Sequence, residues 1–416
     1  MTPVVYAAVW AATGVLAAAL LPLLRRRRLA WIAPAMAGLL GLLVTASDRW
    51  PGPTSAGYGA SFVLGHPAVG LLVGAGLALA ATLALAPRLE GGEALTTAFV
   101  GAAGVVLLSA TVPIIWSLAI AAAVSALAVR WIAAAPGRAA LATGRIAGIG
   151  AASLLAASAF IPRASEAIDT RTALAGGLLA GGLCAQLALV PLGGWASAAV
   201  SAVKAADLAP WMLLLAPAVL FSAGLVLPQL PLGARTPLAN TLLGLGLATA
   251  LFNGVQALRD RTGAYGRVVL ADYALAAAAL GTQHSTARLG GYLVVLAHLC
   301  AAPLLLNPAR AGLERQRRLA WLSLVTVPPL PGFWGRFLAL QAFAASGTAV
   351  SVFSYVAVAV LTAVAVRGLA GRGATPRPDT PPAGIPSRAL AWLIVVALLG
   401  LGFAPEPIAL HVFGVG

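Results

Sequence analysis

Four ionisable side chains lie inside otherwise apolar segments, where they could move protons. Arg267 and Asp272 fall in segment 264–281, His298 in segment 289–306 and Arg336 in segment 319–345. An ionisable group at bilayer depth costs at least ~2.5 to 3.5 kcal/mol on insertion scales, so each one is a candidate for a functional pathway. A carboxylate and an imidazole can exchange protons, whereas arginine stays charged. The sequence therefore predicts a proton path through Asp272 and His298. Arg267 and Arg336 would set the electrostatic field around it.

Some of these residues also have a purely structural interpretation. Arg267, and Arg145 in segment 142–161, are close enough to helix ends for their side chains to reach the lipid headgroups. A lone histidine on an apolar helix is as often a packing residue as a proton shuttle, so both interpretations of His298 stay open. Asp272 is harder to explain as structure, because Arg267 lies five positions away, a poor spacing for a pair within one helix.

The cysteines and histidines give no sign of a metal or cofactor site. Cys184 and Cys300 are isolated in apolar segments, and the four histidines have no ligand spacing. We expect no cofactor, no metal and no catalytic residue of redox type in this chain.

Composition places the chain in a lipid bilayer. Hydrophobic residues make up 61% of the 416 residues and charged residues 9%, and the mean hydropathy is +0.96. No water-exposed globule of this size presents such a surface. The net charge of +15 is scattered through short loops instead of one face, which excludes nucleic acid as a partner.

The pattern of apolar segments predicts one all-α polytopic membrane domain, residues 1–416. A span needs about 20 apolar residues, and about fourteen such segments occur: 3–24, 29–46, 67–86, 94–112, 113–134, 142–161, 172–193, 209–228, 237–257, 264–281, 289–306, 319–345, 348–366 and 388–412. The proline-rich stretch 371–387 reads as a cytoplasmic linker before a C-terminal helix at 388–412.

Basic residues predict the orientation, because cytoplasmic loops carry the lysine and arginine excess. Every loop after an odd-numbered segment is basic, with Arg25 to Arg28, Arg88, Arg138, Lys204, Arg259 and Arg261, Arg310 to Arg318, and Arg367 to Arg377. Both termini are then expected on the outer face of a bacterial inner (plasma) membrane.

The twelfth segment cannot be one continuous helix. Pro328, Pro329 and Pro331 each remove a backbone donor, and Gly332 follows them. Broken helices survive at membrane depth only where protein or water satisfies the freed carbonyls, and they typically line ion pathways.

The stretch from Val327 to Phe337, VPPLPGFWGRF, resembles a signature of the antiporter-like subunits of respiratory complex I, which are related to cation/proton antiporter subunits. Two further motifs of this family are similar to segments of this chain: NGVQALRDRTGAY, from Asn253 to Tyr265, and VPLGGW, from Val190 to Trp195. The sequence GFWGR is most similar to the N-type subunit of the family. The resemblance implies fourteen helices: N-terminal helices over 1–112 and two inverted five-helix repeats, 113–228 and 237–366, each with a broken helix. It also implies a second break near Gly182 to Pro191.

The family's row of titratable residues is incomplete here. Gln186 stands where the family has a lysine, its glutamate falls near Ala121 or Ala122, and another lysine is matched only if Lys204 takes its place. Further along, Leu270 and Ala302 stand where a histidine and a lysine are expected, while His298 and Arg336 remain as matches.

Two functions from different classes follow from the resemblance. In the first, the chain is a non-redox membrane-arm subunit of a proton-translocating NADH-quinone oxidoreductase, meeting quinone only through the complex. In the second, it is a degenerate antiporter-like subunit with a mainly structural role in such a complex, or in a related membrane-bound hydrogenase or cation/proton antiporter. Both imply other membrane subunits and the lipid bilayer as partners.

Overall fold

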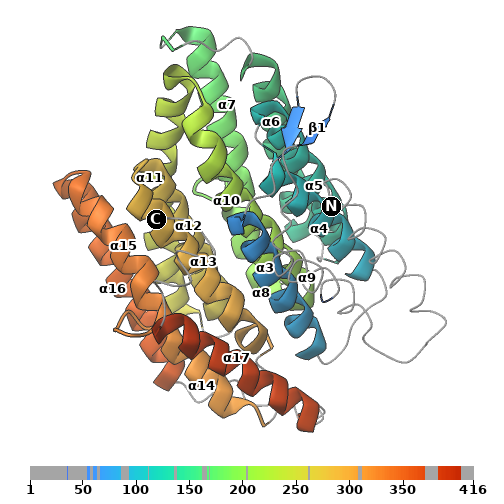
Figure 1. Ribbon diagram of the computed structural model, residues 1–416, viewed down its shortest axis with the longest axis vertical. Coiled ribbons are helices and arrows are strands. Elements are labelled where there is room, and N and C mark those ends of the chain that lie inside the picture. Colours follow the sequence, from blue (N-terminus) through green and yellow to red (C-terminus); the bar gives the residue numbers. More distant parts are fainter. Residues whose placement is uncertain are drawn as a thin grey trace.

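The protein is an all-α polytopic membrane protein, seen in a computed structural model (Figure 1). The structure describes residues 35, 54–56, 60–62, 66–85, 93–110, 112–134, 138–161, 166–167, 169–202, 205–260, 263–307, 312–370 and 383–403. The N-terminal span expected at 3–24, and the span expected at 29–46 apart from residue 35, lie outside these residues, as does Lys204.

The other twelve expected spans each correspond to one helix or to an interrupted helix. The first half of the chain forms α3 (His66–Leu85), α4 (Glu93–Ser109), α5 (Pro113–Ala134), α6 (Arg138–Phe160), α7 (Thr170–Gln186), α8 (Gly194–Ala202), α9 (Ala205–Pro210), a π-helical turn (Trp211–Leu215), α10 (Ala216–Val226) and a 3₁₀ turn (Leu227–Gln229). The second half forms α11 (Leu232–Arg259), α12 (Ala264–Gly281), α13 (Ser285–Leu305), α14 (Glu314–Ser323), α15 (Pro331–Ala345), α16 (Thr348–Ala370) and α17 (Ile385–Phe403). A short antiparallel hairpin, β1 (Thr54–Ala56) with β2 (Ala60–Phe62), was not predicted.

Several boundaries differ from those expected. The start of α14 at Glu314 places Arg315 to Arg318 in its first turns instead of in a loop, and α17 begins at Ile385, inside the expected linker. A charged first turn explains the shift of α14, because an apolar segment is taken to end at charged residues although the backbone hydrogen bonds of a helix continue through them. α17 begins earlier because Pro386 lies in its first turn, where a helix tolerates proline.

Burial separates central from peripheral helices. In the span Leu208–Gln229, 94% of the residues in the most apolar stretch are buried. In Thr348–Ala370 and in Ile385–Phe403 the buried share is 33%. Figure 1 shows α12 and α13 in the middle of the bundle, with α15 and α16 at one edge and α5 and α6 at the other. The edge helices therefore present apolar faces to the surroundings, as a bilayer requires.

Both expected breaks are present. α7 ends at Gln186 and α8 begins at Gly194, while α14 ends at Ser323 and α15 begins at Pro331. Side chains replace the lost backbone donors in the first break: the indole of Trp195 donates to the carbonyl of Ala185 at 3.0 Å, and that of Trp211 to the carbonyl of Gln186 at 3.3 Å. These indoles satisfy carbonyls that lipid could not.

A third irregularity, in the span expected at 209–228, was not predicted. The π-helical turn at Trp211–Leu215 is followed by Pro217, which has no N–H to give to the carbonyl of Met212. The hydroxyl of Tyr273 donates to that carbonyl at 2.6 Å. The turn thus ties this central span to α12.

Candidate functional site

Asp272, His298 and Arg336 meet in the interior of the second half of the chain. His298 Nε2 lies 2.7 Å from Asp272 Oδ2. Two nitrogens of Arg336 donate to the same carboxylate: Nε to Oδ1 at 3.0 Å and Nη2 to Oδ2 at 2.6 Å. The three residues are 0%, 1% and 1% exposed. We call them the buried triad.

Close helix packing brings these three side chains together. α12 lies against α11 through two glycines, because a Cβ on Gly246 would come within 2.6 Å of the Ala274 carbonyl and one on Gly281 within 2.5 Å of the Ala239 carbonyl. α13 and α15 approach in the same way through Gly290 and Gly335, where a Cβ on either would lie 2.7 to 2.8 Å from the other's carbonyl. Small residues let backbones approach where lipid supplies no hydrophobic drive, so these contacts pack closely the helices that carry the triad.

Arg336 also completes the second helix break. Its Nη1 donates to the freed carbonyl of Leu324 at 2.8 Å and to Thr326 Oγ1 at 2.8 Å. The hydroxyl of Thr362 on α16 donates to Thr326 Oγ1 at 2.7 Å and is itself close to the carbonyl of Val358, at 2.8 Å. The arginine therefore links the carboxylate on α12 to the end of α14 and, through Thr326, to α16.

Aromatic side chains enclose the other side of His298. The hydroxyl of Tyr265 lies 3.4 Å from His298 Nδ1 and equally far from the His298 carbonyl. Tyr273 packs its ring edge-on to the imidazole, with centroids 5.9 Å apart, and Trp321 packs edge-on to Tyr265 at the same distance. The result is a continuous row of polar groups, from Tyr265 through the triad to Thr362, inside an apolar bundle.

The three side chains of the buried triad differ in what they can do in proton transfer. Asp272 has both oxygens engaged by Arg336, and arginine does not deprotonate in proteins. The imidazole of His298 has one nitrogen on each side: Nε2 faces the carboxylate of Asp272, and Nδ1 faces the hydroxyl of Tyr265. A neutral histidine leaves the triad with no net charge, and a protonated one leaves it at +1.

The remaining predicted residues lie elsewhere. Arg267 does not join the triad; its Nε donates to Asp260 Oδ2 at 3.0 Å, at the start of α12. This carboxylate lies close to the helix end, so the arginine reaches it without being fully buried. Arg145 is exposed on α6, as expected for a side chain that reaches the headgroups. Lys204 is outside the described residues.

The first break contains no counterpart of the triad. Gln186 is 3% exposed there, and its Nε2 has no hydrogen-bond partner among the residues the structure describes. The stretch from Leu187 to Gly193 has no titratable side chain. The two breaks are alike in backbone but unlike in chemistry.

Sequence reasoning missed the hydroxyl groups around the triad. Tyr265 and Thr326 stand inside or next to the quoted motifs, so their position gave a signal. Tyr273 and Thr362 gave none, because a single tyrosine or threonine in an apolar helix is unremarkable by type alone.

No protein-family model matches the chain, and no curated protein matches its sequence. Solved structures do match over nearly the whole length. A chain of respiratory complex I from Thermus thermophilus with bound NADH has a TM-score of 0.81 at 17% identity, with 98% of this chain and 97% of that one covered. A chain of the membrane-bound sulfane sulfur reductase, an archaeal respiratory membrane complex, has a TM-score of 0.78 at 17% identity, with 98% and 96% covered. A chain of the Mrp complex from Dietzia sp. has a TM-score of 0.75 at 14% identity, with 100% and 98% covered.

The chain has the antiporter-like subunit fold. This confirms the fold that the VPPLPGFWGRF motif indicated. Chains of three different complexes are similar to it, so the antiporter-like fold leaves the function to be argued from the site.

Proposed function

We propose that this protein is an antiporter-like membrane-arm subunit of a complex I-like NADH-quinone oxidoreductase, and that it contributes to proton translocation. The observation that carries the proposal is the buried triad beside the second helix break. A fully buried carboxylate held by both arginine and histidine is costly to place in a membrane, and such groups mark ion and proton pathways.

Each member of the triad has a separate task in this proposal. His298 holds and releases the proton, receiving it from or passing it to the side of Tyr265. Asp272 fixes the orientation of the imidazole and offsets its charge when it is protonated. Arg336 keeps Asp272 ionised and, through Leu324 and Thr326, ties the charge of the triad to the geometry of the break. Electron transfer and quinone reduction take place in other subunits of the complex.

A mainly structural role is the second candidate, and the first break favours it. Gln186 cannot titrate, and the break around it is closed by the indoles of Trp195 and Trp211. A proton that reached His298 would find no titratable station there. In this case the triad would be a packing element of a subunit in complex I or in a related hydrogenase or antiporter complex.

Proton translocation per electron in the assembled complex separates the two candidates. Asp272→Asn and His298→Ala should lower this ratio while the complex still assembles, as judged by co-purifying subunits. His284→Ala is the matched control, because this histidine is exposed at the start of α13, far along the helix from His298. An unchanged ratio in the double variant, with assembly intact, would establish the structural role.

We further propose that both termini lie on the outer face of a bacterial inner membrane. The predicted cytoplasmic loops after α11 and α16 meet at one end of the molecule, since the guanidinium of Arg367 hydrogen-bonds the carbonyl of Leu258. Their common location supports one shared side for these basic loops. The positive-inside tendency then assigns that side to the cytoplasm.

A further inference from the structure

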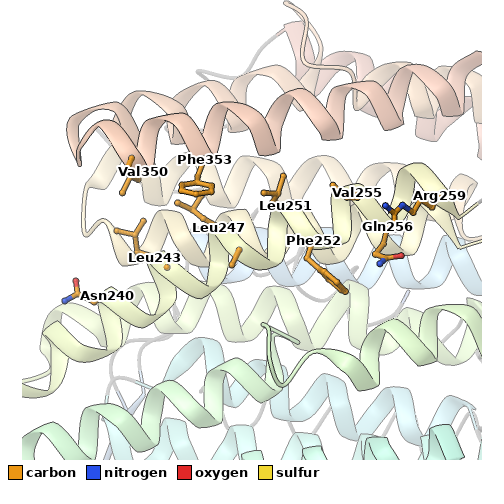
Figure 2. Close-up of a pocket in the computed structure, with 13 residues that line it drawn as sticks. Asn240, Leu243, Leu247, Leu251, Phe252, Val255, Gln256, Arg259, Val350 and Phe353 are labelled. Carbon is orange, nitrogen blue, oxygen red and sulfur yellow. The ribbon is translucent and has the colours of Figure 1, made fainter.

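A long groove runs along the outward face of α11 beside the start of α16. Its volume is about 780 Å³, and Figure 2 shows its lining residues following α11, with Val350 and Phe353 of α16 over one end. The only charged residue in the lining is Arg259, at the last turn of α11. It is distinct from the buried triad, which lies on the inner side of α12.

The floor of the groove is a stripe of small and apolar residues. Four exposed residues follow one another at every fourth position and therefore share one face of the helix: Asn240, Gly244, Ala248 and Phe252. Gly244 leaves open space, because a Cβ there would meet no atom within 4 Å. From Asn240 to Arg259 the stripe is about 28 Å long at 1.5 Å per residue.

Positive charge collects at the Arg259 end. Arg259 is exposed and pairs with no carboxylate of the described residues. Arg367 lies beside it, bound to the carbonyls of Leu258 and Asp260. The carboxylate of the next residue, Asp260, is engaged by Arg267 and by the backbone N–H of Gly263.

We propose that this groove binds an anionic diacyl phospholipid. The phosphate lies at Arg259, with the amide of Gln256 as a second donor, and one acyl chain follows Phe252, Ala248 and Gly244 toward the bilayer centre. Half of a ~30 Å hydrocarbon core is about 15 Å. Counted from Gln256, below the phosphate, this equals about ten residues of α11, which places the chain end between Ala248 and Gly244 and leaves the part near Asn240 to the opposite leaflet.

Charge decides between a lipid and a helix of another subunit. A partner helix needs only the apolar stripe, and it would bury the uncompensated Arg259 at a cost unless it brought its own carboxylate. A phospholipid from the leaflet at that end supplies both parts, a negative headgroup at the rim and a chain for the stripe. The groove therefore fits the lipid without any further assumption about a partner.

Native mass spectrometry of the full-length purified protein tests the proposal, with added phosphatidylglycerol and phosphatidylcholine as probes. Arg259→Gln should weaken phosphatidylglycerol retention about fivefold, the effect of one arginine near an anionic headgroup, and should leave phosphatidylcholine nearly unchanged. Gly244→Phe should fill the groove and weaken retention of both lipids.

The controls are Arg145→Gln and Gly177→Phe, an exposed arginine on α6 and a glycine of α7 with equally open space around its Cβ. The proposal is overturned if the controls lower retention as much as the test variants do, because the lipid would then be unspecific. It is also overturned if a photo-crosslinker replacing Gly244 in the assembled complex labels a polypeptide instead of lipid.

Discussion

Removing Arg336 should expose how strongly the triad is coupled. Arg336→Met deletes two hydrogen bonds to Asp272, of 3.0 and 2.6 Å, and two to the helix break, each of 2.8 Å. It leaves a carboxylate that is 0% exposed without its cation. Breaking a buried pair in this way costs about 3–5 kcal/mol.

A double-mutant cycle isolates the interaction between the two charges. Asp272→Asn alone leaves Arg336 buried without its anion and should cost about 3 kcal/mol. In the double variant neither charge is stranded, so the combined loss should fall short of the sum by about 2 kcal/mol or more. The free energy of unfolding can be followed by titrating the purified protein from mild detergent into a denaturing detergent, with tryptophan fluorescence as the signal.

Two outcomes would refute this reasoning. Additivity of the two single variants, to within about 0.5 kcal/mol, would mean that Asp272 and Arg336 do not interact in the folded protein. The control is Arg145→Met, which removes an exposed arginine and should change stability by no more than about 0.5 kcal/mol. A loss at Arg145 as large as that at Arg336 would show that the assay reports on net charge and not on burial.

Three further predictions follow from the packing and the topology. Gln186→Leu should stabilise the protein by about 1 kcal/mol, because the Nε2 that it removes is buried without a partner; destabilisation in the same unfolding assay would contradict this. Gly246→Leu should destabilise by about 3 kcal/mol, since the Ala274 carbonyl lies 2.6 Å from the added Cβ, whereas Gly181→Leu, where no atom lies within 4 Å, should be tolerated. Single cysteines placed at Arg315 or Arg318 should react with a membrane-impermeant maleimide only from the cytoplasmic side, and labelling from outside would reverse the topology.

The elements of the fold could be predicted because they depend on local features. Runs of about 20 apolar residues mark the spans, and the prolines from Pro328 to Pro331 mark a break wherever they occur in a helix. The π-helical turn at Trp211–Leu215 could not be predicted, since it depends on Tyr273, 61 residues away, supplying the donor that Pro217 lacks. Long-range contacts of this kind leave no periodic trace in the sequence.

The sequence indicated which residues form the candidate site but not how they contact one another. Asp272, His298 and Arg336 could be singled out because each is ionisable in an apolar segment. Their contacts depend on the glycine pairs that set the distances between α11, α12, α13 and α15, and glycines are too common here to identify those four in advance. Arg267 does not contact the triad, because it pairs with the carboxylate of Asp260 at the end of α11.

The contrast between the two breaks bears on why the triad exists. A broken helix needs donors for its freed carbonyls, and the first break obtains them from the indoles of Trp195 and Trp211 without any charge. The second break uses Arg336, which can be buried only together with Asp272, and a buried ion pair of this kind rarely adds net stability over apolar packing. Since an uncharged solution is present in the same chain, closing the break does not by itself account for the charges. That excess of buried charge, placed in direct contact with the imidazole of His298, favours a role in proton transfer over one in packing.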